Sequence, residues 1–152
     1  MPINYKDRYD NKEKPHFHYV NLNPVGRHTA DCVIRAMAMF LDWSWQEVMM
    51  ELCHFCCENG YIPNYKTGYN SYLICQGIPP QKVKTKLTVK EFLDLIADND
   101  KDYLLVTSNH MTCIKDGRIN DTWDCSGRQV KMFWVKDKKQ ETRKFYKDGQ
   151  QQ

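Results

Sequence analysis

The sequence has no long apolar run and no obvious targeting segment. No stretch approaches the roughly 18 to 20 apolar residues of a membrane-spanning helix, and the opening MPINYKDRYDNKEK has no apolar core of the signal-peptide kind. Internal repeats and low-complexity segments are missing as well. These absences argue against a membrane, secreted or repeat protein. We therefore expect one cytoplasmic domain with no membrane partner.

The chain also has little excess of charge. Its 152 residues carry a formal net charge of +3, which is too small to indicate a nucleic-acid-binding body. Much of the positive charge lies in the C-terminal stretch KDKKQETRKFYKDG. We expect residues 137–152 to form a basic, solvated tail, and we expect no specific nucleic acid partner.

The chain has seven cysteines, an odd number, and no apparent secretion signal. Both observations indicate reduced thiols. The segment CHFCC, residues 53–57, could supply soft ligands to zinc, but structural zinc sites draw their ligands from two separated pairs. The surrounding stretch is typical of one continuous helix from Ser44 to Gly60. The three cysteines of the segment would then share a stripe with Met49, as on a buried face. We therefore predict no metal ion and no other cofactor.

Helices are predicted in the first part of the chain and strands in the last. The segments YLLVTS, HMTCIK, RIND and VKMFWV have the composition of successive strands. This segregation favours an α+β domain, with N-terminal helices packed on a C-terminal antiparallel sheet. Residues 1–22 are expected to form an extended arm, and Thr29 or Asp31 can cap the first helix. The predicted helices cover 32–41, 44–60, 69–75 and a segment that begins at Thr88, the second and last opening with capping boxes.

A hairpin turn fixes the expected register of two strands. The Asp-Gly pair at 116–117 is the strongest short hairpin signal, a type I′ turn. With these residues as the loop, Lys115 pairs with Arg118 and the register runs outward from there. His110 and Asp121 then lie on one face as diagonal neighbours, about 7 to 8 Å apart at the backbone. The imidazole and the carboxylate are within reach of each other.

This pair also has a structural interpretation. A buried histidine bonded to a carboxylate is common in protein cores. Thr112 lies opposite Asp121 and could satisfy the carboxylate instead of His110. Trp123 falls directly opposite His110, where it either roofs the imidazole and contacts a substrate or packs as a core residue.

Cys32 occupies the start of the first predicted helix, in the segment HTADCVIRAMAMF. A thiol in the first turn lies where the helix dipole favours the thiolate, although a lone cysteine there also fits a core position. In combination with His110 and Asp121 it completes a nucleophile, a general base and an orienting acid. The sequence therefore predicts a Cys-His-Asp triad.

Two segments carry a resemblance to a known family. NPVGRHTADCVIRAMA followed by HMTCIKDGRINDTWDC resembles small, single-domain papain-like cysteine peptidases encoded by phages and prophages of Gram-positive bacteria. The resemblance runs from about Asn23 to Trp134, which sets the expected catalytic domain at 23–136. It implies a papain-like fold in the cytoplasm of a bacterial host. It also implies Cys32 as nucleophile, His110 as general base and acid, and Asp121 as the orienting residue.

One position departs from the papain-like pattern. Papain-like enzymes usually carry a glutamine six residues before the nucleophile, where it helps form the oxyanion hole, and here that position is Gly26. The amide of Asn23 is our candidate for the missing donor, beside the backbone N–H of Cys32. Asn23 equally fits an ordinary Asn-Pro turn. His28 and Thr29 are the other nearby donors.

The sequence thus predicts a thiol hydrolase that cleaves peptide or isopeptide bonds in a peptide or protein substrate through an acyl-enzyme. An acyltransferase or transglutaminase-like enzyme would use the same triad with an amine as acceptor. A third reading is a catalytically silent papain-like protein that binds a host protein. The N-terminal arm, which contains His16 and His18, is a candidate cover for the cleft.

Overall fold

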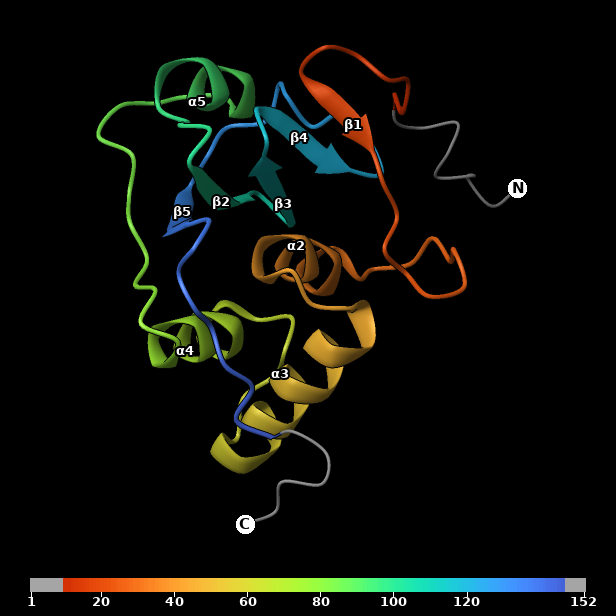
Figure 1. Ribbon diagram of the computed structural model, residues 1–152, viewed down its shortest axis with the longest axis vertical. Coiled ribbons are helices and arrows are strands. Elements are labelled where there is room, and N and C mark those ends of the chain that lie inside the picture. The colour runs from red at the N-terminus through yellow and green to blue at the C-terminus, as the bar shows by residue number, and fades with distance from the viewer. Residues whose placement is uncertain (1–9, 147–152) are drawn as a thin grey trace.

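The computed structural model describes residues 10–146, which form an α+β domain with four helices and a five-stranded mixed sheet (Figure 1). The α+β class predicted from the sequence is confirmed. No helix within this range is long and apolar enough to cross a membrane. The helices are α2 (Cys32–Leu41), α3 (Trp45–Asn59), α4 (Lys66–Cys75) and α5 (Val89–Leu95). The strands are β1 (Phe17–Tyr19), β2 (Lys101–Thr107), β3 (His110–Lys115), β4 (Arg118–Asp121) and β5 (Met132–Asp137).

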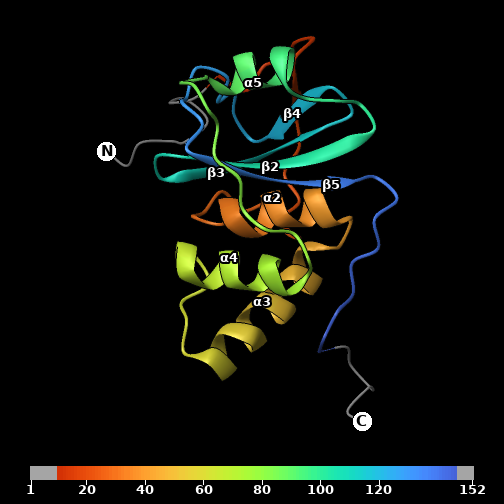
Figure 2. The same ribbon diagram turned by 90° about the vertical axis from the view of Figure 1, so that its left-hand side faces the viewer.

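The sheet is covered on both faces. Figure 2 shows α2 against one face, with α3 and α4 beyond it, and α5 on the opposite side. Met111 and Cys113 of β3 are buried in the core shared with α2. Ile114 of β3 and Ile119 of β4 are buried in the second core, with α5. Alternate residues of each strand therefore enter different cores, and the sheet holds α2 in a fixed position.

The helix starts follow the sequence closely. At the start of α3, Ser44 Oγ accepts from the backbone N–H of Glu47 at 3.0 Å, and Glu47 Oε1 accepts from the backbone N–H of Ser44 at 2.9 Å. Thr88 and Glu91 form the same box at the start of α5. Both predicted capping boxes are therefore confirmed. Each box satisfies two backbone N–H donors that a helix start leaves unpaired.

Helix α4 begins at Lys66, three residues before the predicted start at Tyr69. The prediction treated Gly68 as a position outside the helix. Gly68 instead lies in the first turn, where an added Cβ would come within 2.4 Å of the carbonyl oxygen of Ile62. The glycine permits this close approach of two backbone segments.

The hairpin between β3 and β4 has the predicted register. Lys115 pairs with Arg118, and the pairing continues outward through the strands. Asp116 and Gly117 both have positive φ, 55° and 74°, as the two central residues of a type I′ turn require. The register prediction is therefore confirmed from Lys115–Arg118 to Cys113–Asn120, whereas Trp123, which the sequence predicts opposite His110, lies beyond the end of β4.

The sheet is mixed rather than wholly antiparallel, which corrects the prediction. The strand order is β1-β4-β3-β2-β5, and β1 runs parallel to β4. Phe17 of β1 is fully buried, so this part of the expected arm belongs to the domain. A three-residue strand with one fully buried side chain gives almost no periodic signal, and its pairing partner is about a hundred residues away.

The predicted buried stripe of α3 is also corrected. Cys56 is buried, but Cys53 is only half-buried and Cys57 and Met49 are exposed. Leu52 and other apolar residues at helical spacing fill the core instead. The buried residues of α3 are Val48, Glu51, Leu52, Phe55 and Cys56.

The described part of the basic tail docks on the helices instead of projecting into solvent. The backbone N–H groups of Phe145 and Tyr146 donate to the carboxylate of Glu51 at 2.8 and 2.7 Å. Gln76 of the α4 C-terminus bonds both the N–H and the carbonyl of Arg143. Side-chain contacts add to these bonds: Tyr146 stacks on His54, and Lys144 pairs with Glu47. All of these partners are distant in sequence, so composition alone did not reveal the docking.

Replacing Glu51 by alanine is expected to lower the free energy of unfolding by at least about 2 kcal/mol. Glu51 is 3% exposed, and its carboxylate also accepts from the Tyr72 hydroxyl at 2.6 Å. The substitution therefore leaves three donors without their acceptor. Urea unfolding measures the change. Glu141→Ala removes the same charge from an exposed position and should stay within about 0.5 kcal/mol of the native protein; equal effects of the two substitutions would contradict this account.

Candidate active site

The candidate nucleophile, Cys32, is the first residue of α2 and is half-buried. The residue before it, Asp31, occupies the N-cap position but makes no side-chain cap hydrogen bond. The expectation that Asp31 caps this helix is therefore wrong for its side chain. The Asp31 carboxylate is bonded instead to Arg35, Asn23 and Trp45, so the first-turn backbone N–H groups lack it as an acceptor. The positive end of the helix dipole favours the anionic form of the thiol.

His110 begins β3, directly after a tight turn. Ser108 and Asn109 form this turn, Asn109 with a positive φ of 60°, and Thr107 pairs with His110 across it. His110 Nε2 lies 2.6 Å from Asp121 Oδ2. Both side chains are almost fully buried, 9% and 2% exposed. Nε2 is held by the carboxylate, which leaves Nδ1 as the ring nitrogen for proton exchange with Cys32.

The pKa shifts of the three groups fit together. Burial raises the pKa of the Cys32 thiol, but the hydrogen bond and charge of His110 outweigh this, so that the pKa falls below its ordinary value. Burial lowers the pKa of His110, and the charge and hydrogen bond of Asp121 reverse the shift and raise it. Burial raises the pKa of Asp121, and the charge of His110 reverses this and lowers it. The arrangement therefore favours a thiolate beside an imidazolium.

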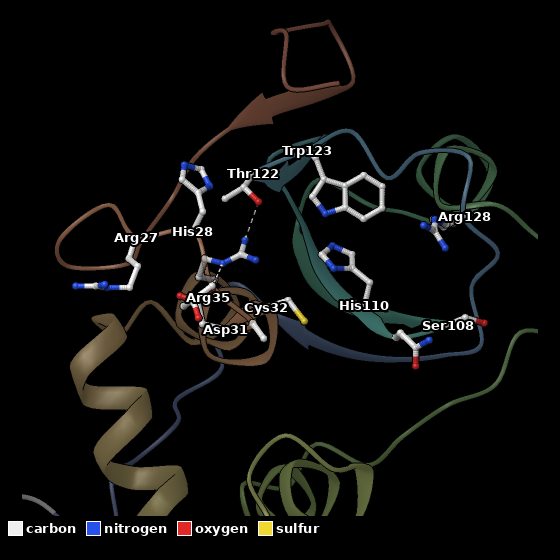
Figure 3. Close-up of a pocket in the computed structure, with 13 residues that line it drawn as sticks. Arg27, His28, Asp31, Cys32, Arg35, Ser108, His110, Thr122, Trp123 and Arg128 are labelled. Atoms are coloured by element: carbon white, nitrogen blue, oxygen red, sulfur yellow. Dashed lines mark hydrogen bonds and ion pairs between the residues drawn. The ribbon is translucent and has the colours of Figure 1, made fainter. Parts of the chain in front are cut away.

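Arg35, which the sequence interpretation did not single out, connects the helix start to the triad acid. Its Nε donates to Asp31 Oδ1 at 2.7 Å, and one terminal nitrogen donates to Asp121 Oδ1 at 3.1 Å. The same nitrogen lies 3.3 Å from the Thr122 hydroxyl, as Figure 3 shows. The i, i+4 spacing of Asp31 and Arg35 was the available signal. One guanidinium thus bridges two buried carboxylates.

Asp121 receives its short contacts from three sides. Besides His110 and Arg35, the backbone N–H of Thr122 donates to Oδ1 at 2.7 Å. The carboxylate lies beside the imidazole, as the hairpin register predicts, and most of its hydrogen-bonding capacity is filled. Thr112, the alternative partner considered from the sequence, is buried nearby on β3, but the imidazole takes the 2.6 Å bond.

Asn23, the candidate oxyanion donor, stabilises the loop before Cys32 instead. Its Nδ2 donates to Asp31 at 3.1 Å, and its Oδ1 accepts from the backbone N–H groups of Val25 and Arg27, both at 3.1 Å. The side chain is buried and is not part of the cleft wall. The prediction of an oxyanion donor at this position is therefore corrected, and the Asn-Pro turn is the interpretation that fits.

The backbone conformation at Gly26 favours glycine. Its φ is +67°, a conformation that side chains with a Cβ rarely adopt. Its N–H closes a turn to the carbonyl of Asn23 at 3.0 Å. His28 and Thr29, the other donors considered, do line the cleft.

A cleft of about 410 Å³ opens over Cys32 and His110. Cys32, His110 and Trp123 lie on its wall, with the thiol directed toward the imidazole (Figure 3). The Trp123 ring lies against that of His110, with centroids 4.7 Å apart and planes at 48°. Trp123 therefore covers one side of the imidazole and lies on the cleft wall.

The described part of the N-terminal arm does not cover this cleft. None of residues 10–22 lies on its wall. His16 bonds Asp124 at 3.0 Å and His18 bonds Glu13 at 2.8 Å, both away from the cleft wall. Residues 1–9, to which the covering hypothesis also applied, lie outside the described residues.

One group of side chains has the donor types of a metal site. His110, Asp121 and Cys125 place one ligand atom each within 4.8 Å of one another, all at least partly buried. Cys125 Sγ lies 3.6 Å from Asp121 Oδ2. His110 Nε2 and Asp121 are already joined by the 2.6 Å hydrogen bond, and Arg35 places a positive charge on the same carboxylate. This donor set fits an acid-base pair better than a cation.

No protein family model matches the chain, and neither a curated protein nor a solved structure matches it.

Proposed function

We propose that the protein is a cysteine peptidase or closely related thiol hydrolase, with Cys32, His110 and Asp121 as its triad. One observation carries the proposal: a helix-start thiol of lowered pKa shares a cleft wall with an imidazole that a buried carboxylate holds at 2.6 Å. This combination supplies a nucleophile, a proton shuttle and an orienting group. A structural histidine-aspartate pair would not require an open cleft with a half-buried thiol beside it.

The reaction follows from these positions. The Cys32 thiolate attacks the carbonyl carbon of a peptide or isopeptide bond and forms a C–S bond. His110, protonated in the ion pair, gives its proton to the leaving nitrogen as the C–N bond breaks, which leaves an acyl-enzyme. A water molecule then attacks the thioester carbonyl while His110 takes one of its protons; the C–S bond breaks, the carboxylic acid product leaves, and the Cys32 thiolate is restored beside the protonated His110.

The start of α2 also contributes to the reaction. The backbone N–H of Cys32 lies at the positive end of the helix dipole, where a negative oxygen is stabilised. We assign it as one donor to the oxyanion that forms during attack. We place the second donor among the polar groups of the cleft wall, of which His28 and Thr29 lie in the loop shortly before Cys32.

The arrangement also supports the papain-like resemblance. A cysteine at the start of a central helix, with histidine and aspartate on adjacent strands of a later sheet, follows the papain-like order of catalytic residues. We therefore propose a small papain-like fold of the kind encoded by phages and prophages. The parallel strand β1 is an addition at the sheet edge beyond the triad.

The test is to map which cysteine reacts first with a limiting dose of iodoacetamide at about pH 5.5, where an unperturbed thiol is almost entirely protonated. Mass spectrometry is expected to find Cys32 labelled ahead of all others, because its thiolate persists in acid. Cys57 and Cys75 are exposed and serve as internal controls for access. Labelling led by these exposed thiols, or none at Cys32, would overturn the proposal and favour a binding protein. Cleavage of a quenched peptide pool, with Cys32→Ala as the control, then tests hydrolysis directly.

A further inference from the structure

The walls of the cleft carry more positive than negative charge. Three arginines line it, Arg27, Arg35 and Arg128, against a single carboxylate, Asp31. The whole chain has nearly balanced charge, with 22 basic and 19 acidic residues. The excess at the cleft is therefore a local feature and not a consequence of composition.

The single carboxylate cannot offset this charge for an incoming ligand. Asp31 is buried, and its two oxygens accept from Arg35, from Asn23 and from Trp45 Nε1, the last at 2.9 Å. Arg35 in turn is committed to Asp31 and Asp121. These charges neutralise one another inside the wall, and the remaining guanidiniums are those of Arg27 and Arg128.

Arg27 and Arg128 have exposed side chains and no carboxylate within ion-pair distance among residues 10–146. Their backbones are held in place. The N–H of Arg27 bonds Asn23 Oδ1 at 3.1 Å, and the N–H of Arg128 bonds the carbonyl of Cys125 at 3.0 Å. The Arg128 guanidinium lies 5.4 Å from the centre of the Trp123 ring, a cation-π contact that positions the charge.

The two arginines lie on opposite sides of the reacting pair. Figure 3 shows Arg27 at one end of the cleft and Arg128 at the other, with Cys32 and His110 between them. A chain that crosses the cleft over the thiol must pass both guanidiniums. Arginine binds carboxylates through paired N–H groups, which suits acidic side chains.

We propose that the cleft selects an acidic peptide segment, in which Asp or Glu side chains flank the bond attacked by Cys32 and pair with Arg27 and Arg128. This inference rests on the proposed function, since it names the substrate class of the same site. His110 delivers a proton to the leaving nitrogen, so the side of the cleft beyond His110 and Trp123 receives the leaving segment. Arg128 therefore pairs with an acidic residue after the scissile bond, and Arg27 with one before it.

The test uses two thiol reagents of nearly equal shape, N-iodoacetyl-glutamate amide and N-iodoacetyl-glutamine amide. They differ by one negative charge at neutral pH. The rate of each with Cys32 is divided by its rate with N-acetylcysteine amide, which removes intrinsic reactivity. The glutamate reagent is expected to react about threefold faster or more at low salt, and the preference should fade as salt screens the guanidiniums.

Three charge-removing variants assign the effect. Arg27→Gln and Arg128→Gln are each expected to lower the glutamate preference. Lys84→Gln removes the same charge from an exposed site outside the cleft wall and should leave it unchanged. Equal rates of the two reagents in the native protein, or a preference that neither arginine substitution alters, would overturn the inference alone. If Cys32 reacts with neither reagent, the proposed function fails and the inference fails with it.

Discussion

His110→Ala is expected to slow the alkylation of Cys32 by iodoacetamide by up to about a thousandfold at about pH 5.5. The hydrogen bond and charge of His110 are what hold the pKa of Cys32 below its ordinary value against the effect of burial. Without the imidazole, burial is the largest remaining influence and favours the neutral thiol. The loss should shrink as the pH rises toward the ordinary thiol pKa of about 8.5. A rate-pH profile of Cys32 labelling measures both effects.

Two further variants separate the proton-exchange role of His110 from a structural one. His110→Gln retains an N–H that can donate to Asp121, so it should preserve the fold and still lose the reactivity at acid pH. His28→Ala removes a histidine from the same cleft wall, in a loop before the helix, and should leave the profile close to native. An acid limb of the profile that is unchanged in both His110 variants would show that the histidine does not activate the thiol.

Arg35→Met is expected to lower the free energy of unfolding by about 3 to 5 kcal/mol, the typical cost of removing one partner of a buried ion pair. The guanidinium bridges Asp31 and Asp121 at 2.7 and 3.1 Å, and both carboxylates are buried. Its loss leaves two negative charges with fewer partners beside the thiol. Urea unfolding at neutral pH measures the change, and Arg27→Met, at an exposed arginine without an ion pair in residues 10–146, should stay within about 0.5 kcal/mol.

The pH dependence gives a second measure of the same bridge. The folded-state pKa of Asp121 is lowered, against burial, by His110 and Arg35. A carboxylate whose pKa is lowered by folding stabilises the folded state at pH values above its unfolded-state pKa of about 3.9. This stabilisation disappears as the pH falls through the folded-state pKa. The difference in the free energy of unfolding between Arg35→Met and the native protein should therefore become smaller in strong acid. Replacing Asp31 by asparagine in the Arg35→Met background should restore part of the stability, and no recovery would contradict the bridge.

The hairpin shows how far local sequence reasoning can reach. The Asp-Gly pair at 116–117 sets a turn with positive φ at both residues, and strand periodicity then places His110 beside Asp121 without any other information. The prediction succeeded because each step depends on neighbours within a few residues. Capping boxes at Ser44 and Thr88 are equally local, and both were found.

Features that depend on distant partners were missed. Asn23 was assigned to a substrate oxygen because nothing in its neighbours reveals that Asp31 turns away from the helix start to meet it. Arg35 pairs with Asp121, 86 positions away, through tertiary packing alone. The charge of the cleft likewise depends on Arg27 and Arg128, which meet across one cavity only after the sheet and α2 have come together.

The pairing of β1 with β4 has a consequence for the timing of synthesis. β1 is made about a hundred residues before its partner strand, which ends at Asp121, and the N–H of Val20 bonds the carbonyl of Asp121 at 2.9 Å. The helix that bears Cys32 is likewise complete long before His110 is translated. Contacts between such distant segments form late. During synthesis the Cys32 thiol therefore stays without the His110 imidazole until β3 has been made and has joined α2.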